Sequence, residues 1–241
     1  MRLDKYLCNA LGVTKPQALA MILAGELKVN GKPCTAPETQ VHESNHIERQ
    51  GQTLALKPFR YLMMHKPTGV ICSNKDEAYP SLFTGTGIER ADGLHLVGRL
   101  DADTTGLVIV TDDGRWSFNI TRPEFKCWKT YQVSLRDVLS PEQTREYQQR
   151  LAQGLSLQNQ PKPTRPAKFE VINDSTVSLS IVEGKFHQVK QMFAALGNRV
   201  VGLHRTQIGS VILDIEVGEW RVLTEQEVAS FSVADSDPIG R

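Results

Sequence analysis

Residues 98–110 read GRLDADTTGLVIV, in which a charged loop leads directly into an apolar run. The run Leu107–Val110 is short, rich in β-branched residues and uninterrupted, so it predicts a buried strand. The loop before it holds Arg99, Asp101 and Asp103. Taken alone, an Asp-x-Asp loop has three interpretations: a turn whose carboxylates accept backbone N–H bonds, a Mg²⁺ site, or a site of covalent chemistry.

Extended segments flank this loop on both sides. The spacing of apolar residues predicts strands over 61–64, 70–72, 94–97, 130–135 and 177–181. Helices are expected over 140–154, over 186–196 and from Thr224, which forms a capping box with Glu227. The pair Asp113-Gly114 is expected to close the strand 107–110 as a hairpin turn. These patterns predict a mixed α/β domain on a largely antiparallel sheet.

The first 58 residues have a different pattern. Apolar residues at helical spacing predict one helix over 3–11 that ends at Gly12, and a second helix between Thr14 and Gly25. The pair Asn30-Gly31 is the strongest short-range signal for a hairpin turn. Lys57-Pro58 suits a linker, because proline favours extended geometry in the residue before it. We therefore expect two domains, 1–58 and 59–241.

Composition excludes several classes of protein. With 40% hydrophobic and 23% charged residues, the chain has the composition of a globular protein rather than a disordered or fibrous one. No apolar run approaches the roughly 18 residues of a membrane span, and the N-terminus has no secretory signal, so we expect no membrane partner. The four cysteines form no Cys-x-x-Cys pair, which fits reduced thiols in a cytoplasmic protein rather than a zinc site.

The charge of the chain is nearly balanced but unevenly distributed. There are 28 basic and 27 acidic residues, and the net charge of +1 by itself argues against a nucleic-acid partner. Residues 114–136, however, hold five basic residues and one acidic residue, whereas 206–241 hold two and seven. Residues 185–213 hold four Lys or Arg, two His and no acidic residue. Because nucleic acid responds to the local field, these basic segments keep RNA open as a partner.

Two N-terminal segments resemble the S4 RNA-binding domain, a small helical fold also described as alpha-L. They are RLDKYL at 2–7 and GELKVNG at 25–31. Without this resemblance, the spacing fits a helical domain with a solvated charged face equally well. The resemblance implies RNA contacts from basic residues of this domain: Arg2, Lys5, Lys15, Lys28 and Lys32.

Three later segments resemble motifs of the RNA pseudouridine synthases. They are GRLDADTTGL at 98–107, KTYQV at 129–133 and EGKFHQVKQM at 183–192, in the order in which that family has them. The form of the first motif, the S4-like domain and KPTG at 66–69 point to the branch that modifies ribosomal RNA. The resemblance implies an S4 domain joined to a catalytic domain on a largely antiparallel mixed sheet. It also implies an isomerase that converts a uridine of 16S ribosomal RNA into pseudouridine.

The resemblance also assigns catalytic roles. Asp101 matches the family's catalytic carboxylate, Lys190 the cation that pairs with it, and Tyr131 the residue that stacks on the target base. Family mechanisms differ on whether the carboxylate attacks the base, attacks C1′ or removes a ribose proton. Without the resemblance, Lys190 is a solvated helix residue and Tyr131 is an ordinary strand aromatic.

Further residues are expected to hold the substrate or support the site. The resemblance implies substrate contacts from the following residues: Arg99, Lys129, Lys185 and Gln188. Arg99 fits equally a pair with a structural acid. Asp103 is expected to fix the loop, and His187 and His204 to be structural or to face RNA. Because the reaction breaks the N1–C1′ bond and joins C5 to C1′, it needs no redox partner or group donor. We therefore expect no cofactor and no metal.

Three other functions fit parts of the sequence. A large-subunit synthase of the same family would carry the same motifs. A non-catalytic S4-domain ribosome-assembly factor would tolerate the loss of Asp101. A metal-dependent phosphotransfer enzyme would use the aspartates Asp101, Asp103, Asp112 and Asp113, and a chelator would abolish its activity. We expect a monomer whose partner is 16S ribosomal RNA or a small-subunit assembly intermediate.

Overall fold

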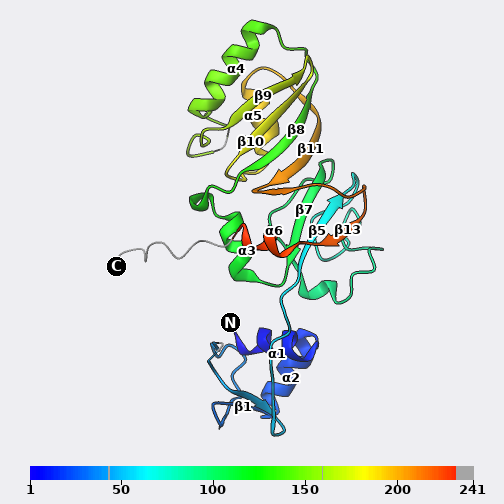
Figure 1. Cartoon of the computed structure of the whole chain (residues 1–241), viewed down its shortest axis with the longest axis vertical. Coiled ribbons are helices and arrows are strands. Elements are labelled where there is room, and N and C mark those ends of the chain that lie inside the picture. Colours follow the sequence, from blue (N-terminus) through cyan, green and yellow to red (C-terminus); the bar gives the residue numbers. More distant parts are fainter. Residues whose placement is uncertain (43, 159, 232–241) are drawn as a thin grey trace, which may run out of the picture. The chain divides into compact units, whose positions relative to one another are not determined.

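The computed structural model describes residues 1–42, 44–158 and 160–231 (Figure 1). The chain forms two compact units. The first contains Met1–Phe59 together with Glu89–Leu94, and the second contains Arg60–Ile88 and the chain from His95 onward. The segment Glu89–Leu94 belongs to the first unit although the sequence-based division assigns it to the second domain. No local pattern signals that a distant segment of chain returns to an earlier unit.

The first unit has two helices and a four-stranded antiparallel sheet in the order β2-β1-β3-β4. Its elements are α1 (Leu3–Leu11), α2 (Lys15–Leu23), β1 (Leu27–Val29), β2 (Lys32–Pro33), β3 (Ile47–Arg49) and β4 (Gln52–Thr53). As predicted, Gly12 ends α1 in the left-handed conformation, with φ of 73°. Asn30 and Gly31 both have positive φ, 51° and 78°, which is the hairpin geometry that an Asn-Gly pair favours.

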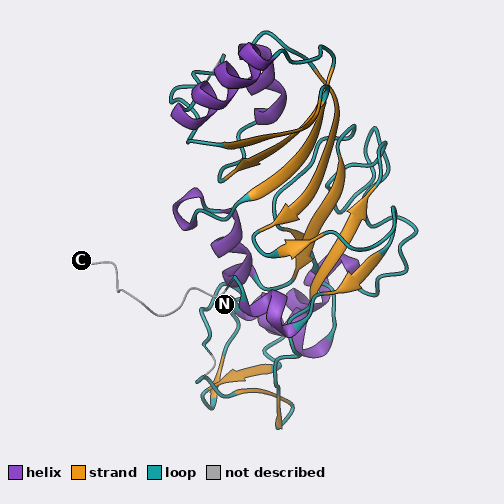
Figure 2. Ribbon diagram, turned by 45° about the horizontal axis from the view of Figure 1, so that its top comes forward, coloured by secondary structure: helices purple, strands orange, loops and turns teal. Residues whose placement is uncertain are grey.

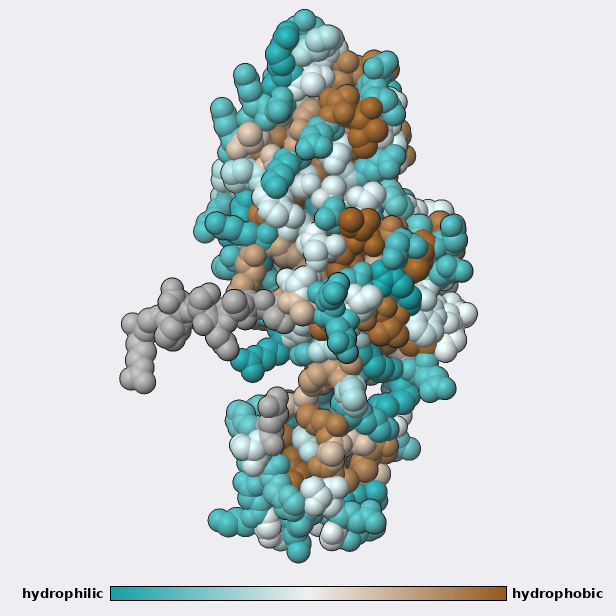
Figure 3. All heavy atoms as spheres, in the orientation of Figure 1, coloured by the Kyte–Doolittle hydropathy of each residue, from teal (hydrophilic) through white to brown (hydrophobic). Residues whose placement is uncertain are grey.

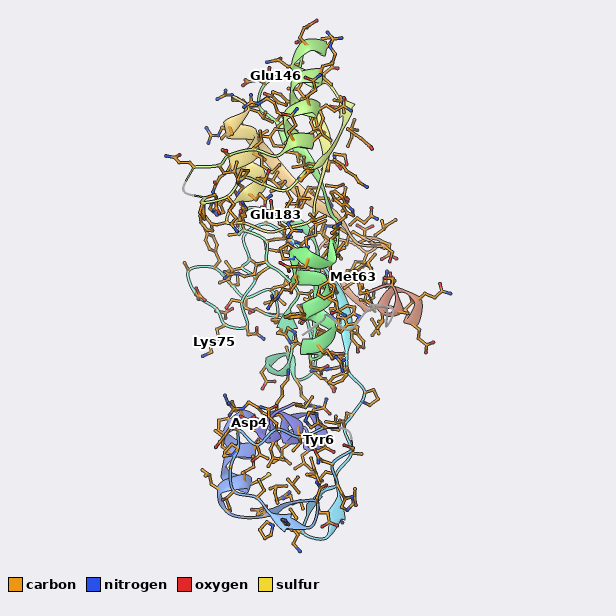
Figure 4. The ribbon with its side chains drawn as sticks, turned by 90° about the vertical axis from the view of Figure 1, so that its left-hand side faces the viewer. Asp4, Tyr6, Met63, Lys75, Glu146 and Glu183 are labelled. Carbon is orange, nitrogen blue, oxygen red and sulfur yellow. The ribbon has the colours of Figure 1, made fainter. Side chains whose placement is uncertain are left out.

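The apolar faces of α1 and α2 pack on this small sheet. The core residues are completely buried, and they are Leu3, Leu7, Ala18, Ile22, Leu27 and Ile47. Tyr6 of α1 is also buried, and its hydroxyl donates to the carbonyl oxygen of Leu54 at 2.7 Å (Figure 4). The unit therefore has a hydrophobic core of its own.

The second unit is built on a nine-stranded mixed sheet, which Figure 2 shows as one strongly curved layer. Its main strand order is β13-β5-β7-β11-β8-β10-β9, with β6 paired to β7 and β12 paired to β11. The strands are β5 (Tyr61–Lys66), β6 (His95–Leu96), β7 (Thr105–Thr111), β8 (Lys129–Leu135), β9 (Lys168–Asn173), β10 (Thr176–Ile181), β11 (Val200–Ile208), β12 (Val211–Ile212) and β13 (Trp220–Val222). Among these pairings only β7 with β11 is parallel, so the predicted sheet type is confirmed.

Helices cover the sheet of the second unit. They are α3 (Gly114–Thr121), α4 (Pro141–Gln153), α5 (Gln188–Ala195) and α6 (Glu225–Ala229), besides the short 3₁₀ turn η2 (Pro123–Phe125); the similar turn η1 (Ala91–Gly93) belongs to the first unit. Tyr147 of α4 contacts Phe169 of β9 and Phe193 of α5, each with ring centroids 6.3 Å apart. The two helices therefore share one face of the sheet. Within the described residues, no helix is long and apolar enough to cross a membrane.

The predicted hairpin turn at Asp113-Gly114 is wrong, because a helix begins there. The Asp113 carboxylate accepts hydrogen bonds from the backbone N–H groups of Arg115 and Trp116, both at 3.0 Å, and so caps α3. Trp116 and Ile120 lie four residues apart and are buried on the core side of the helix. Aspartate and glycine are common in turns, but aspartate is also a preferred helix N-cap, and the apolar spacing after it favours the helix.

Two other predicted elements differ from the structure: the start of one helix and one strand. Helix α5 begins at Gln188 rather than at 186, because His187 has a φ of 48° and cannot continue a right-handed helix. Residues 70–72 form no strand, and Ile71 makes only an isolated bridge to Ser81.

Candidate active site

A cavity of about 790 Å³ opens among the three segments of the second unit that carry the motifs. Its walls include most of the loop 98–104, Lys129 and Tyr131 of β8, and residues 184–190 at the start of α5. Leu203 and Arg205 of β11 complete one side. The volume lies within the range of roughly 300–1,000 Å³ that is typical of small-molecule sites.

A cluster of charged side chains stands at the cavity. The Lys190 ammonium lies 3.1 Å from Oδ2 of Asp101, and 2.7 and 3.0 Å from the two carboxylate oxygens of Asp103. On the other side of Asp101, Nε2 of His187 lies 3.5 Å from Oδ1. Asp101 and Lys190 are partly buried, whereas the Asp103 side chain is 70% exposed. One ammonium thus bridges two carboxylates, and one carboxylate lies between a lysine and a histidine.

The bridge affects the ionisation of its members. Burial by itself lowers the pKa of Lys190, but the hydrogen bonds to Asp103 and Asp101 outweigh burial and raise the pKa above its ordinary value. The hydrogen bond from Lys190 also lowers the pKa of Asp103. At neutral pH the lysine is therefore charged and Asp103 is ionised.

Lys66 of β5 holds the loop that carries Asp101. Its side chain is completely buried, and its ammonium donates to the backbone carbonyls of Pro67, Ala102 and Thr104 at 2.9, 3.2 and 2.8 Å. The N–H of Gly69 donates to the same Ala102 carbonyl at 2.9 Å. Burial lowers the pKa of Lys66. The KPTG turn and the aspartate loop are therefore fastened to each other through one lysine.

Arg205 is a pocket residue that the sequence analysis missed. It is 2% exposed, its Nε donates to the Leu107 carbonyl at 2.7 Å, and its Nη1 lies 3.4 Å from the Tyr131 hydroxyl. The guanidinium carbon lies 5.9 Å from the centre of the Tyr131 ring. Its Nη2 has no hydrogen-bond partner among the described residues, which is costly for a buried charged group. The available signal was a charged residue in the middle of a strand within the basic segment 185–213.

Gly106 of the first motif explains how Arg205 comes so close. In the parallel pairing of β7 with β11, Gly106 lies opposite Arg205. Gly106 has a φ of 108°, and a Cβ atom at this position would lie 2.6 Å from the Arg205 backbone nitrogen. Only glycine therefore allows the two strands to approach at this point.

The residues predicted to contact substrate have different surroundings. All four line the cavity: Arg99, Lys129, Lys185 and Gln188. Arg99 is exposed, and its guanidinium makes no hydrogen bond or ion pair with any residue that the structure describes. The Lys129 ammonium is buried and donates to two backbone carbonyls at 3.1 Å, and burial lowers its pKa. The Lys185 ammonium donates to two carbonyls of the loop 162–163, at 2.6 and 2.9 Å.

The Gln188 side chain lies within the wall of the cavity rather than on the surface of that wall. Its amide nitrogen donates to the carboxylate of Glu183 at 2.9 Å, and its amide oxygen accepts from the backbone N–H of Lys185 at 2.9 Å. Figure 4 labels Glu183, which is buried in the segment between β10 and α5. The Gln188 amide is therefore already engaged in fixing the chain that leads into α5.

The aspartates proposed for a metal-dependent enzyme do not converge. Asp101 and Asp103 precede the seven-residue strand β7, whereas Asp112 and Asp113 follow it. Asp112 pairs with Arg60 at 2.9 Å, and Asp113 caps α3. In the described parts of the chain, no group of three His, Cys, Asp or Glu side chains is arranged to hold a metal ion.

In the first unit, the basic residues predicted to bind RNA are all exposed. They are Arg2, Lys5, Lys15, Lys28 and Lys32. Arg2 forms a 3.0 Å ion pair with Asp4, whereas the four lysine ammonium groups make no ion pair with the described carboxylates. The four lysines are therefore available for phosphate contacts.

Comparison with known proteins defines the class. Residues 60–195 match the RNA pseudouridylate synthase family, and residues 1–47 match the S4 domain. The first match covers more than half of the chain, so the protein belongs to the RNA pseudouridine synthase family. A crystal structure described as a pseudouridylate synthase has a TM-score of 0.70 and 42% sequence identity, covering 96% of this chain and 100% of that one.

Individual relatives are similar over nearly their full length. The "Ribosomal small subunit pseudouridine synthase A" of Vibrio parahaemolyticus is 46% identical over 234 residues, which cover 95% of this chain and 99% of the relative. The protein of the same name from Escherichia coli K12 is 41% identical over 233 residues, with 95% and 99% coverage. The two family matches and these full-length relatives agree with the S4-containing branch that the sequence motifs indicate.

Proposed function

We propose that this enzyme converts one uridine of small-subunit, 16S ribosomal RNA into pseudouridine. The full-length similarity to synthases named for the small ribosomal subunit supports this substrate. The observation that carries the catalytic part is the Asp101 carboxylate in a cavity of nucleotide-accommodating size, ion-paired to Lys190 at 3.1 Å. The proposal places the protein in the cytoplasm as a monomer that acts on ribosomal RNA or an assembly intermediate.

The reaction breaks the N1–C1′ glycosidic bond and joins C5 of the same uracil to C1′. A carboxylate can attack the base, attack C1′ or remove a ribose proton, and an ionised carboxylate serves each route, as it does beside the oxocarbenium-like centre of a glycosidase. Burial disfavours ionisation, whereas nearby cations favour it. In this role Lys190 supplies the positive charge beside Asp101, and His187 lies on the other side of the same carboxylate.

The other pocket residues fit the handling of a flipped nucleotide. Tyr131 lines the cavity and would stack on the uracil, and the Arg205 guanidinium lies 5.9 Å from the centre of its ring. The Arg99 guanidinium, which has no partner among the described residues, would hold the phosphate or sugar of the flipped nucleotide. Lys129, Lys185 and Gln188 shape the wall through their internal hydrogen bonds, and the two lysines add positive charge. Extrusion of a base from its stack costs a few kcal/mol, and the basic residues of both units are proposed to supply that energy through contacts with the surrounding RNA.

The test is the pattern of pseudouridines in ribosomal RNA from a strain that lacks the protein. We expect one modified position of small-subunit RNA to be lost. The wild-type protein should restore it, and Asp101→Asn should not. Asp174→Asn, an exposed carboxylate in the turn between β9 and β10, is the matched control and should restore it. A position lost from large-subunit RNA instead would contradict the substrate, and restoration by Asp101→Asn would contradict the catalytic carboxylate.

A further inference from the structure

Phe186 is the most exposed large hydrophobic side chain of the described residues, with 71% of its surface accessible. It is also part of the cavity wall. A phenyl ring left in water at the mouth of a catalytic pocket is unusual, since aromatic side chains gain by burial. The exposure therefore points to a ligand that covers the ring.

The ring of Phe186 is held in a fixed stack. It lies on the imidazole of His187, with the ring centres 3.7 Å apart and the ring planes 22° from parallel. His187 has a left-handed φ of 48°, and its Nε2 lies 3.5 Å from Oδ1 of Asp101. The Phe186 carbonyl accepts a hydrogen bond from the Gln191 side chain at 2.8 Å. The stack therefore begins at the reacting carboxylate and ends at the outer ring of Phe186.

The surroundings of the stack identify the chemistry of its ligand. Among the described residues, five cationic side chains and one carboxylate, that of Asp101, line the cavity; the cations are Arg99, Lys129, Lys185, Lys190 and Arg205. A strand of RNA is an anionic chain that carries flat aromatic bases. Proteins bind such strands with a cationic groove and exposed aromatic rings on which bases stack. An apolar protein surface would gain nothing from the five cations.

Other exposed apolar side chains lack this arrangement. Figure 3 shows several separate apolar patches among hydrophilic residues on one face of the molecule. The large exposed side chains of β11, β12 and β13 include Val201, Ile212 and Val222, which are 63%, 60% and 62% exposed. These are aliphatic and cannot stack on a base. The other exposed aromatic side chains are less exposed than Phe186, and they are Tyr79, Phe118, Phe125 and Trp220. None of these aliphatic or aromatic side chains lines the cavity.

We propose that Phe186 is a stacking platform for the base of a nucleotide adjacent to the reacting uridine. The site then holds two bases: the reacting uracil inside the cavity with Tyr131, and its neighbour on the outer face of Phe186. Stacking of the neighbouring base on Phe186 helps to keep the uridine extruded, because this contact replaces the stacking partner that the base loses in the RNA. The inference rests on the proposed function, which makes a uridine of RNA the reacting nucleotide.

Binding of short single-stranded RNAs to the full chain tests the platform. The probes are five-nucleotide RNAs with a central uridine and one 2-aminopurine, placed immediately 5′ or 3′ of it, whose fluorescence is quenched by stacking. For one of the two positions we expect quenching by the wild type and by Phe186→Tyr, and none by Phe186→Ala. Base–aromatic stacking corresponds to a loss of about 5- to 150-fold in Kd for Phe186→Ala. Val201→Ala, which removes an exposed side chain outside the cavity, should change neither quenching nor Kd.

An abasic residue in place of the stacked neighbour separates direct contact from an indirect effect. It should weaken binding to the wild type by the same factor as Phe186→Ala, and it should weaken binding to Phe186→Ala no further. Equal losses in both proteins, or no quenching by the wild type at either position, would overturn the platform. The proposed function is tested separately by the ribosomal RNA map of the strain that lacks the protein. A lost small-subunit pseudouridine, with no coupling between the abasic residue and Phe186→Ala, refutes only the platform. Coupling with no pseudouridine lost refutes only the function.

Discussion

Lys190 supplies a cation to Asp101, whereas Asp103 competes with Asp101 for that cation. Lys190 donates to both carboxylates, with its two shorter bonds directed to Asp103 and the longer one to Asp101. An ammonium that neutralises two acids stabilises each less than it would stabilise one alone. Asp101 and Asp103 therefore compete for one cation, and substitutions of Lys190 and of Asp103 should change kcat to different extents.

Lys190→Met should lower kcat at saturating RNA. Methionine keeps much of the side-chain length but removes the charge, so Asp101 loses its ion-pair partner. We expect at least a tenfold loss of kcat at pH 7, or about 1.4 kcal/mol. Lys190→Arg restores the charge and should recover part of that loss. Lys185→Met is the control, because the Lys185 ammonium donates to two backbone carbonyls; it should raise KM and leave kcat in place. An unchanged kcat in Lys190→Met would show that Asp101 does not depend on Lys190.

Asp103→Asn should change kcat much less than Lys190→Met does. The substitution removes a negative charge beside Asp101 and leaves the Lys190 ammonium to one carboxylate. Because the Asp103 side chain is 70% exposed, the effect should be small, and kcat at pH 7 should change by less than about threefold. A tenfold loss, as in Lys190→Met, would mean that Asp103 positions Lys190 more than it competes for it.

The sequence pointed to three residues of the cavity wall more readily than to the residues that support them. Asp101, Tyr131 and Lys190 stand in recognisable motifs, and the structure brings all three to one cavity. The supporting roles of Lys66 and Arg205 were not predicted, because these roles depend on burial. The sequence does not distinguish a buried charged residue from an exposed one. Both act through backbone carbonyls, which carry no sequence signature.

At the scale of elements, the contact between β7 and β11 places Arg205 beside Tyr131. Gly106→Ala should disrupt it, because alanine is strained at a φ of 108° and its Cβ would clash with the Arg205 backbone. We expect a loss of about 2–4 kcal/mol in the free energy of unfolding, measured by urea denaturation. Activity should fall with it, since Arg205 moves away from Tyr131. Gly184→Ala is the control: Gly184 lines the same cavity but has no positive φ, and a Cβ there meets no atom within 4 Å. Equal stability of the two variants would contradict this account.

A charged clamp joins α6 to β13. Arg221 donates to both carboxylate oxygens of Glu227, at 2.7 and 2.8 Å, and this hydrogen bonding lowers the pKa of Glu227 from 4.5 to about 2. A lowered carboxyl pKa gives stability that is complete above the unfolded value and is lost as the pH falls through the folded one. We expect Glu227→Gln to cost about 1 kcal/mol at pH 7, and the difference from the wild type to shrink between pH 4.5 and pH 2. Glutamine can still cap α6, so the variant isolates the charge.

The comparison needs unfolding curves at several pH values. Glu142→Gln is the control, because the Glu142 carboxylate is 76% exposed in its pair with Arg145 and should change stability little. A difference between wild type and Glu227→Gln that stays constant down to pH 2 would mean that the clamp acts through packing rather than through ionisation.

Element prediction succeeded where a local pattern and its caps agreed. The helix α4 begins after Ser140 and ends before Gly154, as its capping residues indicate. Element prediction failed where one signal fits two structures. The pair Asp113-Gly114 fits either a turn or the start of a helix, and the burial of Trp116, three residues after Asp113, favours the helix. The start of α5 was missed because His187 has a left-handed φ, a conformation that few residues other than glycine adopt. This conformation occurs together with the stack of Phe186 on His187.

At the scale of the whole molecule, the first unit is proposed to anchor RNA through exposed lysines. Deleting residues 1–58 is a poor test, because Glu89–Leu94 belongs to the same unit: the Arg90 side chain donates to the Cys8 carbonyl at 3.1 Å, and Leu94 is 2% exposed. Replacing the four lysines Lys5, Lys15, Lys28 and Lys32 by glutamine leaves the unit intact. All four are exposed, so the midpoint of unfolding should not change.

The four-lysine variant should bind ribosomal RNA more weakly and with a weaker dependence on salt. Each phosphate contact that is lost reduces the slope of log K against log salt by about 0.9 on a duplex or about 0.7 on single strands, so four contacts change it by roughly 3 to 3.5. Arg2 stays in place because it pairs with Asp4. KM should rise while kcat at saturating RNA is unchanged, since the carboxylate and its partners all belong to the second unit. Single and double replacements should change the slope in proportion. If the slope and affinity of the four-lysine variant match those of the wild type, phosphate binding must come from the basic segments around the cavity, and the first unit would then contribute to recognition by shape alone.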